Sequence, residues 1–155
     1  MDAITPKAKH DTAKPDTVET HSHVVRAADL EWKKTRFPGC EVKGLLFDKA
    51  TGLVTSLIKL APGATLPDHE HVKIEQTYVL EGTLVDKEGP AKGLTVGPGE
   101  FVWREAGTRH VAFTPDGGLM LAMFQVPNKF FEQDGRVTDI SGADWDGVWG
   151  HVFKD

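Results

Sequence analysis

The sequence predicts an all-β protein, built as an antiparallel barrel or sandwich in a single domain. Two observations support this. Many short β-like runs are separated by Gly and Pro turns at even spacing, and no stretch keeps the 3.6-residue period of a long helix. The chain of 155 residues is 39% hydrophobic and 26% charged, which suits one soluble domain with a buried core.

The first segment, residues 1–23, is predicted to be a flexible N-terminal arm before a domain at 24–155. It carries Lys, Asp, Thr, Pro and His and almost no apolar side chains. Such a segment cannot bury enough surface to offset the entropy lost on ordering. Its histidines are therefore interpreted as solvated residues rather than a second metal site. The arm could add a strand to a neighbouring subunit, and a homodimer is the expected assembly.

The domain itself is expected to consist of short strands joined by turns. The predicted strands are 42–47, 53–60, 74–80, 83–86, 93–96, 101–103, 110–113 and 119–126. Gly63, Gly82 and Gly99 lie where strands give way to tight turns. Glycine takes positive φ there without steric cost, so these residues are assigned structural roles.

The segment from Pro127 to Asp155 is expected to be an aromatic C-terminal tail on the barrel. Trp145 and Trp149, four residues apart, could form one helical turn that packs on the barrel or caps its mouth. His151, in the same tail, has no surrounding pattern that indicates a ligand.

Two histidines two residues apart, His69 and His71, give the first indication of function. Residues i and i+2 of a strand point to the same face, so both rings can be directed at one point. A third histidine, His110, begins the apolar run 111–113, which is consistent with an inward ligand at a strand start. Three imidazoles can hold a divalent transition metal with coordination positions left open.

Glu75 is the fourth candidate ligand. It shares the parity of Thr77 and Val79, which predicts that its carboxylate faces the interior, where it would be costly unless paired or metal-bound. In the competing interpretation Gln76 points inward and the site consists of three histidines alone.

The residues around these four follow a longer pattern. The chain contains Gly63-x5-His69-x-His71-x3-Glu75-x6-Gly82, then Gly93-x4-Pro98-Gly99-Glu100, then Ala106-Gly107-Thr108-Arg109-His110. Over about residues 40–127 this resembles the cupin superfamily, in particular small single-domain metal-binding cupins of the RmlC-like type. The resemblance implies an antiparallel cupin β-barrel, a double-stranded β-helix of the jelly-roll type. It also implies one metal on His69, His71, Glu75 and His110.

The resemblance further implies a range of functions. The first hypothesis is an Fe(II)-dependent dioxygenase acting on a small carbonyl compound or aromatic acid. The alternatives are a non-redox metal isomerase or decarboxylase, and a non-enzymatic metal-binding sensor. Fe(II) is the favoured metal, with Zn, Ni or Mn as alternatives. Cupins that cleave diketones often lack the glutamate that this chain keeps at Glu75.

Charge and composition exclude several classes of partner. The formal net charge of −5 argues against nucleic-acid or anionic-membrane surfaces, which need clustered Lys and Arg. No apolar run approaches the roughly 20 residues that span a bilayer, and the N-terminus contains no apolar signal-peptide core. One cysteine, Cys40, rules out an intrachain disulfide. A small-molecule ligand and a cytoplasmic location are expected.

Further side chains near the candidate ligands are assigned more ordinary roles. Arg104, Glu105 and Arg109 flank the turn before His110, and Glu105 is expected to form an exposed salt bridge with one of the two arginines. Five large apolar residues are interpreted as core rather than pocket lining: Phe101, Trp103, Met120, Met123 and Phe124.

Overall fold

The computed structural model describes residues 22–48, 50–126 and 128–139, and these residues form twelve β-strands and one short 3₁₀ helix. The elements are η1 (Ala27–Asp29), β1 (Lys33–Lys34), β2 (Cys40–Asp48), β3 (Leu53–Leu60), β4 (Thr65–His71), β5 (Glu75–Gly82), β6 (Leu84–Glu88), β7 (Thr95–Val96), β8 (Phe101–Arg104), β9 (Arg109–Phe113), β10 (Gly118–Gln125), β11 (Asn128–Phe131) and β12 (Val137–Asp139). The predicted tail tryptophans, and the predicted arm up to residue 21, lie outside the described residues.

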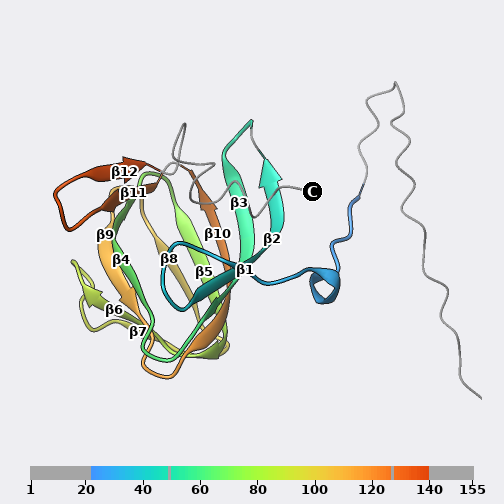
Figure 1. Ribbon diagram of the computed structural model, residues 1–155, viewed down its shortest axis with the longest axis horizontal. Coiled ribbons are helices and arrows are strands. Elements are labelled where there is room, and N and C mark those ends of the chain that lie inside the picture. Colours follow the sequence, from blue (N-terminus) through green and yellow to red (C-terminus); the bar gives the residue numbers. More distant parts are fainter. Residues whose placement is uncertain (1–21, 49, 127, 140–155) are drawn as a thin grey trace, which may run out of the picture.

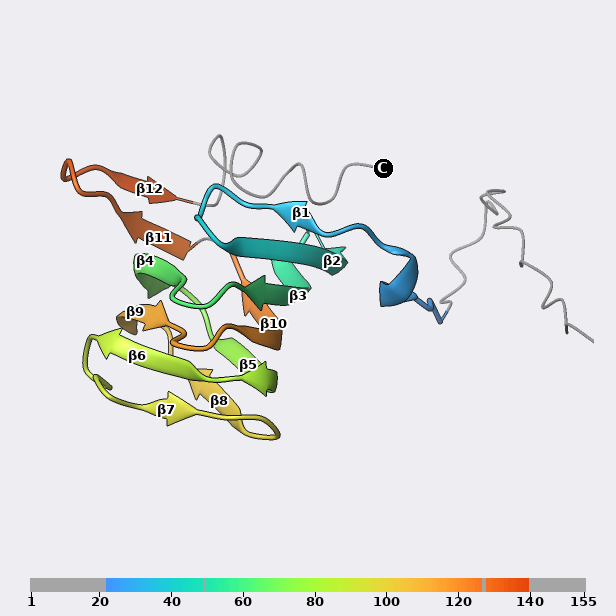
Figure 2. The same cartoon turned by 60° about the horizontal axis from the view of Figure 1, so that its bottom comes forward.

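The strands form two six-stranded antiparallel sheets that face each other (Figures 1 and 2). One sheet has the order β1-β2-β3-β10-β5-β8 and the other β12-β11-β4-β9-β6-β7. Consecutive strands repeatedly cross from one sheet to the other, which is the jelly-roll arrangement of a cupin barrel. The all-β prediction is therefore confirmed. Among the described residues, no helix has the length and apolar character needed to cross a membrane.

The predicted strands recur, the one at 53–60 with the same ends and the others with shifted ends, and four further strands are observed: β1, β4, β11 and β12. The strand predicted at 74–80 is observed as β5, and the strand predicted at 110–113 begins one residue earlier as β9. Part of the predicted tail is a hairpin instead, because β11 pairs with β12 on one side and with β4 on the other. This hairpin extends the sheet that carries the histidines.

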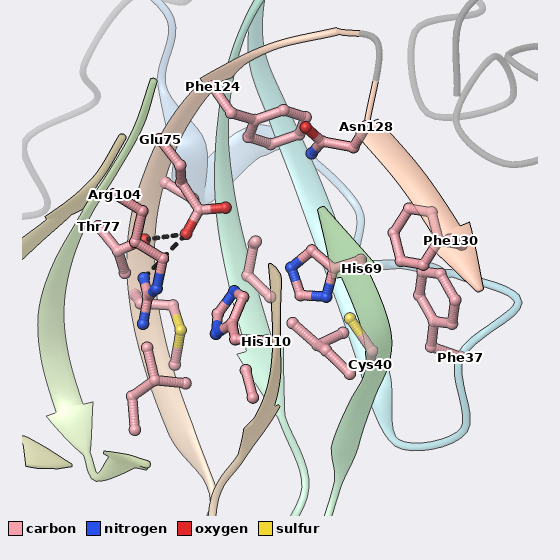
Figure 3. A pocket seen from close by; sticks show the side chains of 16 residues that line it. Phe37, Cys40, His69, Glu75, Thr77, Arg104, His110, Phe124, Asn128 and Phe130 are labelled. Carbon is pink, nitrogen blue, oxygen red and sulfur yellow. Dashed lines mark hydrogen bonds and ion pairs between the residues drawn. The ribbon is translucent and has the colours of Figure 1, made fainter. Parts of the chain in front are cut away.

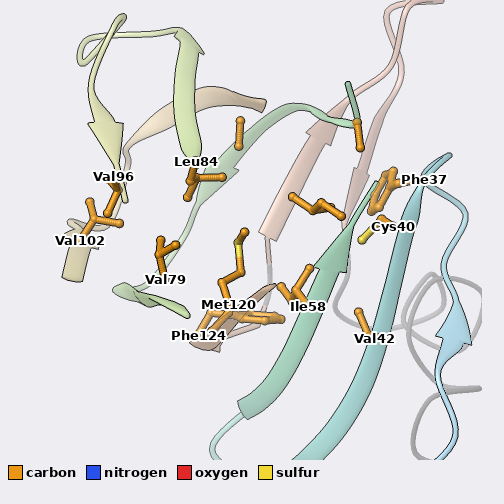
Figure 4. Close-up of a cluster of buried hydrophobic side chains, with 14 of the residues drawn as sticks. Phe37, Cys40, Val42, Ile58, Val79, Leu84, Val96, Val102, Met120 and Phe124 are labelled. Atoms are coloured by element: carbon orange, nitrogen blue, oxygen red, sulfur yellow. The ribbon is translucent and has the colours of Figure 1, made fainter. Parts of the chain in front are cut away.

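The core fills the space between the sheets because side chains alternate in and out along each strand (Figure 4). On β3, Val54, Ser56, Ile58 and Leu60 are buried while the residues between them are partly exposed. Such alternation on both sheets leaves an interior that holds a large set of apolar side chains and a smaller set of polar ones.

The same alternation corrects the assignment of two aromatic residues to the core. Phe101 and Trp103 on β8 are 50% and 54% exposed, because their neighbours Val102 and Arg104 occupy the inward positions. Met120 and Phe124 are buried as predicted, and Met123 is half-buried on the outward face of β10.

Gly82 shows why a turn in this barrel requires glycine. Its φ is +73°, and a Cβ added there would lie 1.9 Å from the backbone oxygen of Gly117. Gly63 also has positive φ, at +78°, but a Cβ would meet nothing within 4 Å. Glycine is needed at Gly82 for close approach of two turns and at Gly63 for conformation alone.

Candidate metal centre

The three histidines are brought together by the pairing of three neighbouring strands. β4 lies between β9 and β11, and His69 stands directly opposite His110 on β9 and Phe130 on β11. His71, two residues further along β4, shares the inward face of His69. The turn before His110 is fastened to the same strand, because the backbone N–H of His71 donates to the carbonyl of Thr108 at 2.9 Å. Local strand geometry thus converges all three rings, as the sequence spacing predicts.

Together these side chains form a buried three-histidine cluster. His69, His71 and His110 are 5%, 0% and 2% exposed, and one ring nitrogen from each lies within 4.8 Å of the other two. The closest approach is 2.9 Å, between Nε2 of His71 and Nε2 of His110. Figure 3 shows the rings of His69 and His110 turned toward the cavity between the sheets.

The hydrogen bonds at the far side of two rings fix which nitrogen faces the cluster. Nδ1 of His69 donates to the carbonyl of Pro67 at 2.7 Å, and Nδ1 of His110 donates to Oδ1 of Asp86 at 2.8 Å. Because these partners only accept, each neutral ring carries its proton on Nδ1 and presents the lone pair of Nε2 to the cluster. An outer partner of this kind on Nδ1 is typical of histidines that bind metals.

The cluster fits a divalent transition metal on this geometry. The Nε2 atoms of His71 and His110, 2.9 Å apart, need a proton or a cation between them. Two nitrogens bound about 2.0–2.1 Å from one ion, at about 90° to each other, would lie about 2.8–3.0 Å apart. Imidazole donors suit Fe, Zn, Ni, Cu and Mn rather than Mg or Ca.

Burial keeps the free imidazoles in the neutral form that a metal requires. Burial, together with the neighbouring His71 and His110, lowers the pKa of His69 to about 3. Burial also lowers the pKa of His71, against the opposing effect of Glu75. Near neutral pH neither ring competes for a proton, and both are free to bind a metal.

Glu75 faces the interior, as its parity predicts, but its carboxylate is engaged by other side chains. Oε1 accepts hydrogen bonds from Nη1 of Arg104 and from Oγ1 of Thr77, both at 3.1 Å (Figure 3). Oε2 lies 3.1 Å from Nδ1 of His71, within ion-pair distance but out of line for a hydrogen bond. Glu75 therefore borders the three-histidine cluster from the side of β5, on the opposite sheet.

A buried ionic network, formed by Glu75, Asp86 and Arg104, supports the cluster from behind. Nη2 of Arg104 donates to Oδ1 of Asp86 at 2.8 Å, the same oxygen that accepts from His110. Arg104 thus connects β8 of one sheet to β6 of the other. Burial would raise the pKa of Asp86, but the hydrogen bond from His110 and the charge of Arg104 outweigh it and the pKa is lowered. Burial would likewise raise the pKa of Glu75, but the charges of His71 and Arg104 outweigh it and the pKa is lowered.

These contacts change the expected roles of Arg104 and Arg109 and add two residues that the sequence did not predict. Arg104 was expected to be available for a surface pair with Glu105, but it is 5% exposed and bound to interior carboxylates. Arg109 pairs with Asp68 instead. Asp86 and Asn128 were not predicted as site residues. A polar side chain at an inward position of a strand is the signal that marks Asp86 in Leu84-Val85-Asp86 and the interior position of Arg104 in Val102-Trp103-Arg104.

A cavity of about 50 Å³ adjoins the cluster. Its polar wall is formed by His69, His110, Glu75, Arg104, Thr77 and Asn128, and its remaining wall is apolar: Phe37, Cys40, Ile58, Leu66, Leu84, Ala112, Met120, Ala122, Phe124 and Phe130. One water molecule needs about 10–15 Å³ of cavity volume measured in the same way, so this cavity is large enough for a small ligand. Oδ1 of the buried Asn128 has no aligned hydrogen-bond partner among the described residues.

Solved structures share this architecture. An acetylacetone dioxygenase from Acinetobacter johnsonii matches with a TM-score of 0.71 and 18% identity, over 92% of this chain and 99% of that chain. A proposed acetylacetone dioxygenase from Methylibium petroleiphilum matches with a TM-score of 0.73 and 22% identity, over 86% of this chain and 97% of that chain.

A third structure, Rhodobacter sphaeroides SigE in complex with the anti-sigma ChrR, matches with a TM-score of 0.53 and 22% identity, over 64% of this chain and 51% of that chain. At these identities the matches show the fold. No curated protein matches the sequence.

A family model settles the membership that the motifs suggested. The model of the ChrR cupin-like domain matches residues 20–129, which include every residue of the three-histidine cluster and the buried ionic network. The chain therefore belongs to the ChrR cupin-like domain family of the cupin superfamily.

Proposed function

We propose that the protein is a mononuclear Fe(II)-dependent dioxygenase acting on a small enolisable carbonyl compound, such as a 1,3-dicarbonyl. The observation that carries the proposal is a cluster of three buried imidazoles beside a small, mainly apolar cavity. The names of two solved structures support this substrate class, since one is an acetylacetone dioxygenase and the other a proposed acetylacetone dioxygenase. Iron bound at such a site would supply Lewis acidity and oxygen activation.

The charges around the cavity favour an anionic ligand. Glu75 and Asp86 contribute two negative charges and Arg104 one positive charge, while the histidines are neutral as ligands. A divalent metal would leave the buried site with a net charge of about +1. A singly charged enolate would neutralise it, whereas a neutral ligand would leave a buried charge unbalanced.

The engagement of Glu75 bears on the same substrate class. Diketone-cleaving cupins often lack a glutamate at this position, and the sequence of this chain differs from them because it has Glu75. With Oε1 held by Arg104 and Thr77, we propose that the metal is bound by His69, His71 and His110 without Glu75.

Other lining residues would select and enclose the substrate. Asn128, 5% exposed, directs an amide with an unpaired Oδ1 at the cavity, where it could bind a hydroxyl or polar edge of the substrate (Figure 3). Phe130 stacks on His69 with ring centroids 5.3 Å apart and packs against Phe37 at 5.0 Å. These rings exclude water from one side of the cluster.

Oxygen uptake tests the proposal. Protein loaded anaerobically with Fe(II) is supplied with a panel of small 1,3-diketones, with 1,4-diketones of similar size as controls that do not form a chelating enolate. We expect one O₂ consumed per 1,3-diketone cleaved, with no external reductant, and no uptake by the His69→Ala variant. The absence of uptake with every compound would refute the proposal, and equal turnover with zinc and without O₂ would favour a non-redox isomerase or decarboxylase.

A metal-binding sensor is the second candidate, favoured by the name of the matching family and by the ChrR relative. The match covers 51% of that chain, so its sigma-factor binding does not carry over. A sensor would bind zinc in the same cluster, gain thermal stability from small ligands and turn none of them over. Turnover of any ligand that stabilises the protein would exclude this candidate.

A further inference from the structure

Arg104 occupies an unusual position for a charged side chain in this barrel. It is 5% exposed and lies between two carboxylates, Glu75 directly opposite it on β5 and Asp86 across the interior on β6. Its Nε has no hydrogen-bond partner among the described residues, so its charge is balanced only through its two terminal nitrogens. A buried cation depends strongly on such partners, because an unpaired charge is costly in the interior.

The contact with Arg104 determines where the Glu75 carboxylate lies. The donor atoms of the three histidines gather within 4.8 Å of one another, and Glu75 is not part of that group. Its Oε1 is instead fixed by Arg104 and Thr77, and its Oε2 lies beside Nδ1 of His71, on the opposite side of the ring from the Nε2 that faces His110.

We propose that Arg104 is a positioning residue that keeps Glu75 out of the metal's donor set and so gives the centre three neutral ligands. The inference rests on the proposed metal centre and deepens it. Glu75 could reach toward the metal only by leaving Arg104, which would then keep Asp86 as its single partner. The planar guanidinium holds both carboxylates at fixed angles, which a single-point cation could not do.

The consequence is a metal that keeps its full charge for an anionic ligand. With three neutral imidazoles the ion carries +2 toward the cavity, and an added carboxylate ligand would reduce this to +1. Arg104 thereby sets the preference of the centre between an anionic substrate and a neutral one.

The test is a double-mutant cycle in which Co(II) replaces Fe(II) or Zn as a spectroscopic probe of the metal centre. Wild type, Glu75→Gln, Arg104→Gln and the double variant are titrated with Co(II), and the visible absorption and dissociation constant are recorded. Arg109→Gln is the matched control, because it removes an arginine one residue from His110 that pairs with half-buried Asp68 and lies over the Phe131 ring.

We expect the Glu75→Gln spectrum to match that of wild type, because Glu75 is not a ligand. Arg104→Gln should shift the bands and tighten Co(II) binding about tenfold, because a buried positive charge is removed and the freed carboxylate joins the centre. The band shift should vanish in the double variant. Identical spectra for wild type and Arg104→Gln would overturn the proposal. So would a shift that persists without Glu75, or a Glu75→Gln spectrum unlike that of wild type.

Two further measurements keep the outcomes separate. Folding of Arg104→Gln is judged by far-ultraviolet circular dichroism. If it does not fold, Arg104→Lys replaces it, because lysine retains the positive charge and loses only the planar, two-pronged guanidinium. The same band shift is expected for Arg104→Lys. If wild type binds Co(II) no better than His71→Ala, the metal centre itself is refuted together with the role of Arg104. If wild type binds one Co(II) and the Arg104 variants match it, only the role of Arg104 is refuted.

Discussion

Replacing Asp86 with Asn should destabilise the metal-free fold, because this carboxylate accepts from both His110 and Arg104 at 2.8 Å. Both members of the Arg104–Asp86 pair are almost fully buried, with side chains 4% and 2% exposed, so solvent screens the pair little. The lowered pKa of Asp86 shows that its ionised form is favoured in place, despite its burial.

The loss in free energy of unfolding depends on how Arg104 is paired after the substitution. Removing one partner of a buried ion pair typically costs about 3–5 kcal/mol, and about 3 kcal/mol is expected here because Arg104 keeps Glu75. At roughly 2–4 °C per kcal/mol for a chain of this size, the melting temperature should fall by about 6–12 °C. Thermal and urea unfolding of chelator-treated protein measure both quantities.

Asp68→Asn is the matched control, because Asp68 pairs with Arg109 at the exposed surface and should lose far less stability. A loss below about 1 kcal/mol in Asp86→Asn would refute the argument that the buried ionic network supports the fold. The same variant should bind metal about 10–100-fold more weakly, since His110 loses its anionic outer partner.

Three further predictions test separate features. Gly82→Ala should prevent or severely impair folding, since the added Cβ would meet the Gly117 oxygen at 1.9 Å, whereas Gly63→Ala, with open space around it, should cost only about 1 kcal/mol in chemical unfolding. Burial raises the pKa of the Cys40 thiol to about 11, so a thiol reagent at pH 8 should react about a hundredfold more slowly than with an exposed cysteine, and denaturant should abolish the difference. Asn128→Leu should raise KM for the oxygen-uptake substrate about tenfold; an unchanged KM would remove Asn128 from substrate binding.

The histidines and the barrel could be predicted from the sequence because their signals are local. Alternation along a strand puts His69 and His71 on one face, and glycines such as Gly82 mark the turns between strands. Both depend on residues a few positions apart, and the structure preserves both. The flexible arm, the homodimer and the cytoplasmic location stay predictions.

The network behind the histidines could not be predicted in the same way. Arg104 contacts Glu75 across one sheet and Asp86 across the interior, and these partners are 29 and 18 residues away in the chain. The hairpin β11–β12 was missed for a similar reason. Its strands are short and follow a proline, and what defines β11 is its pairing with β4, which sets Asn128 opposite His71.

Metal analysis of the wild-type protein beside His71→Ala tests the central claim most directly. After loading with Fe(II) or Zn(II) and removal of free metal, the three-histidine cluster predicts about one divalent ion per wild-type chain and almost none in the variant. Equal metal content in the two proteins, or none in either, would contradict the metal centre.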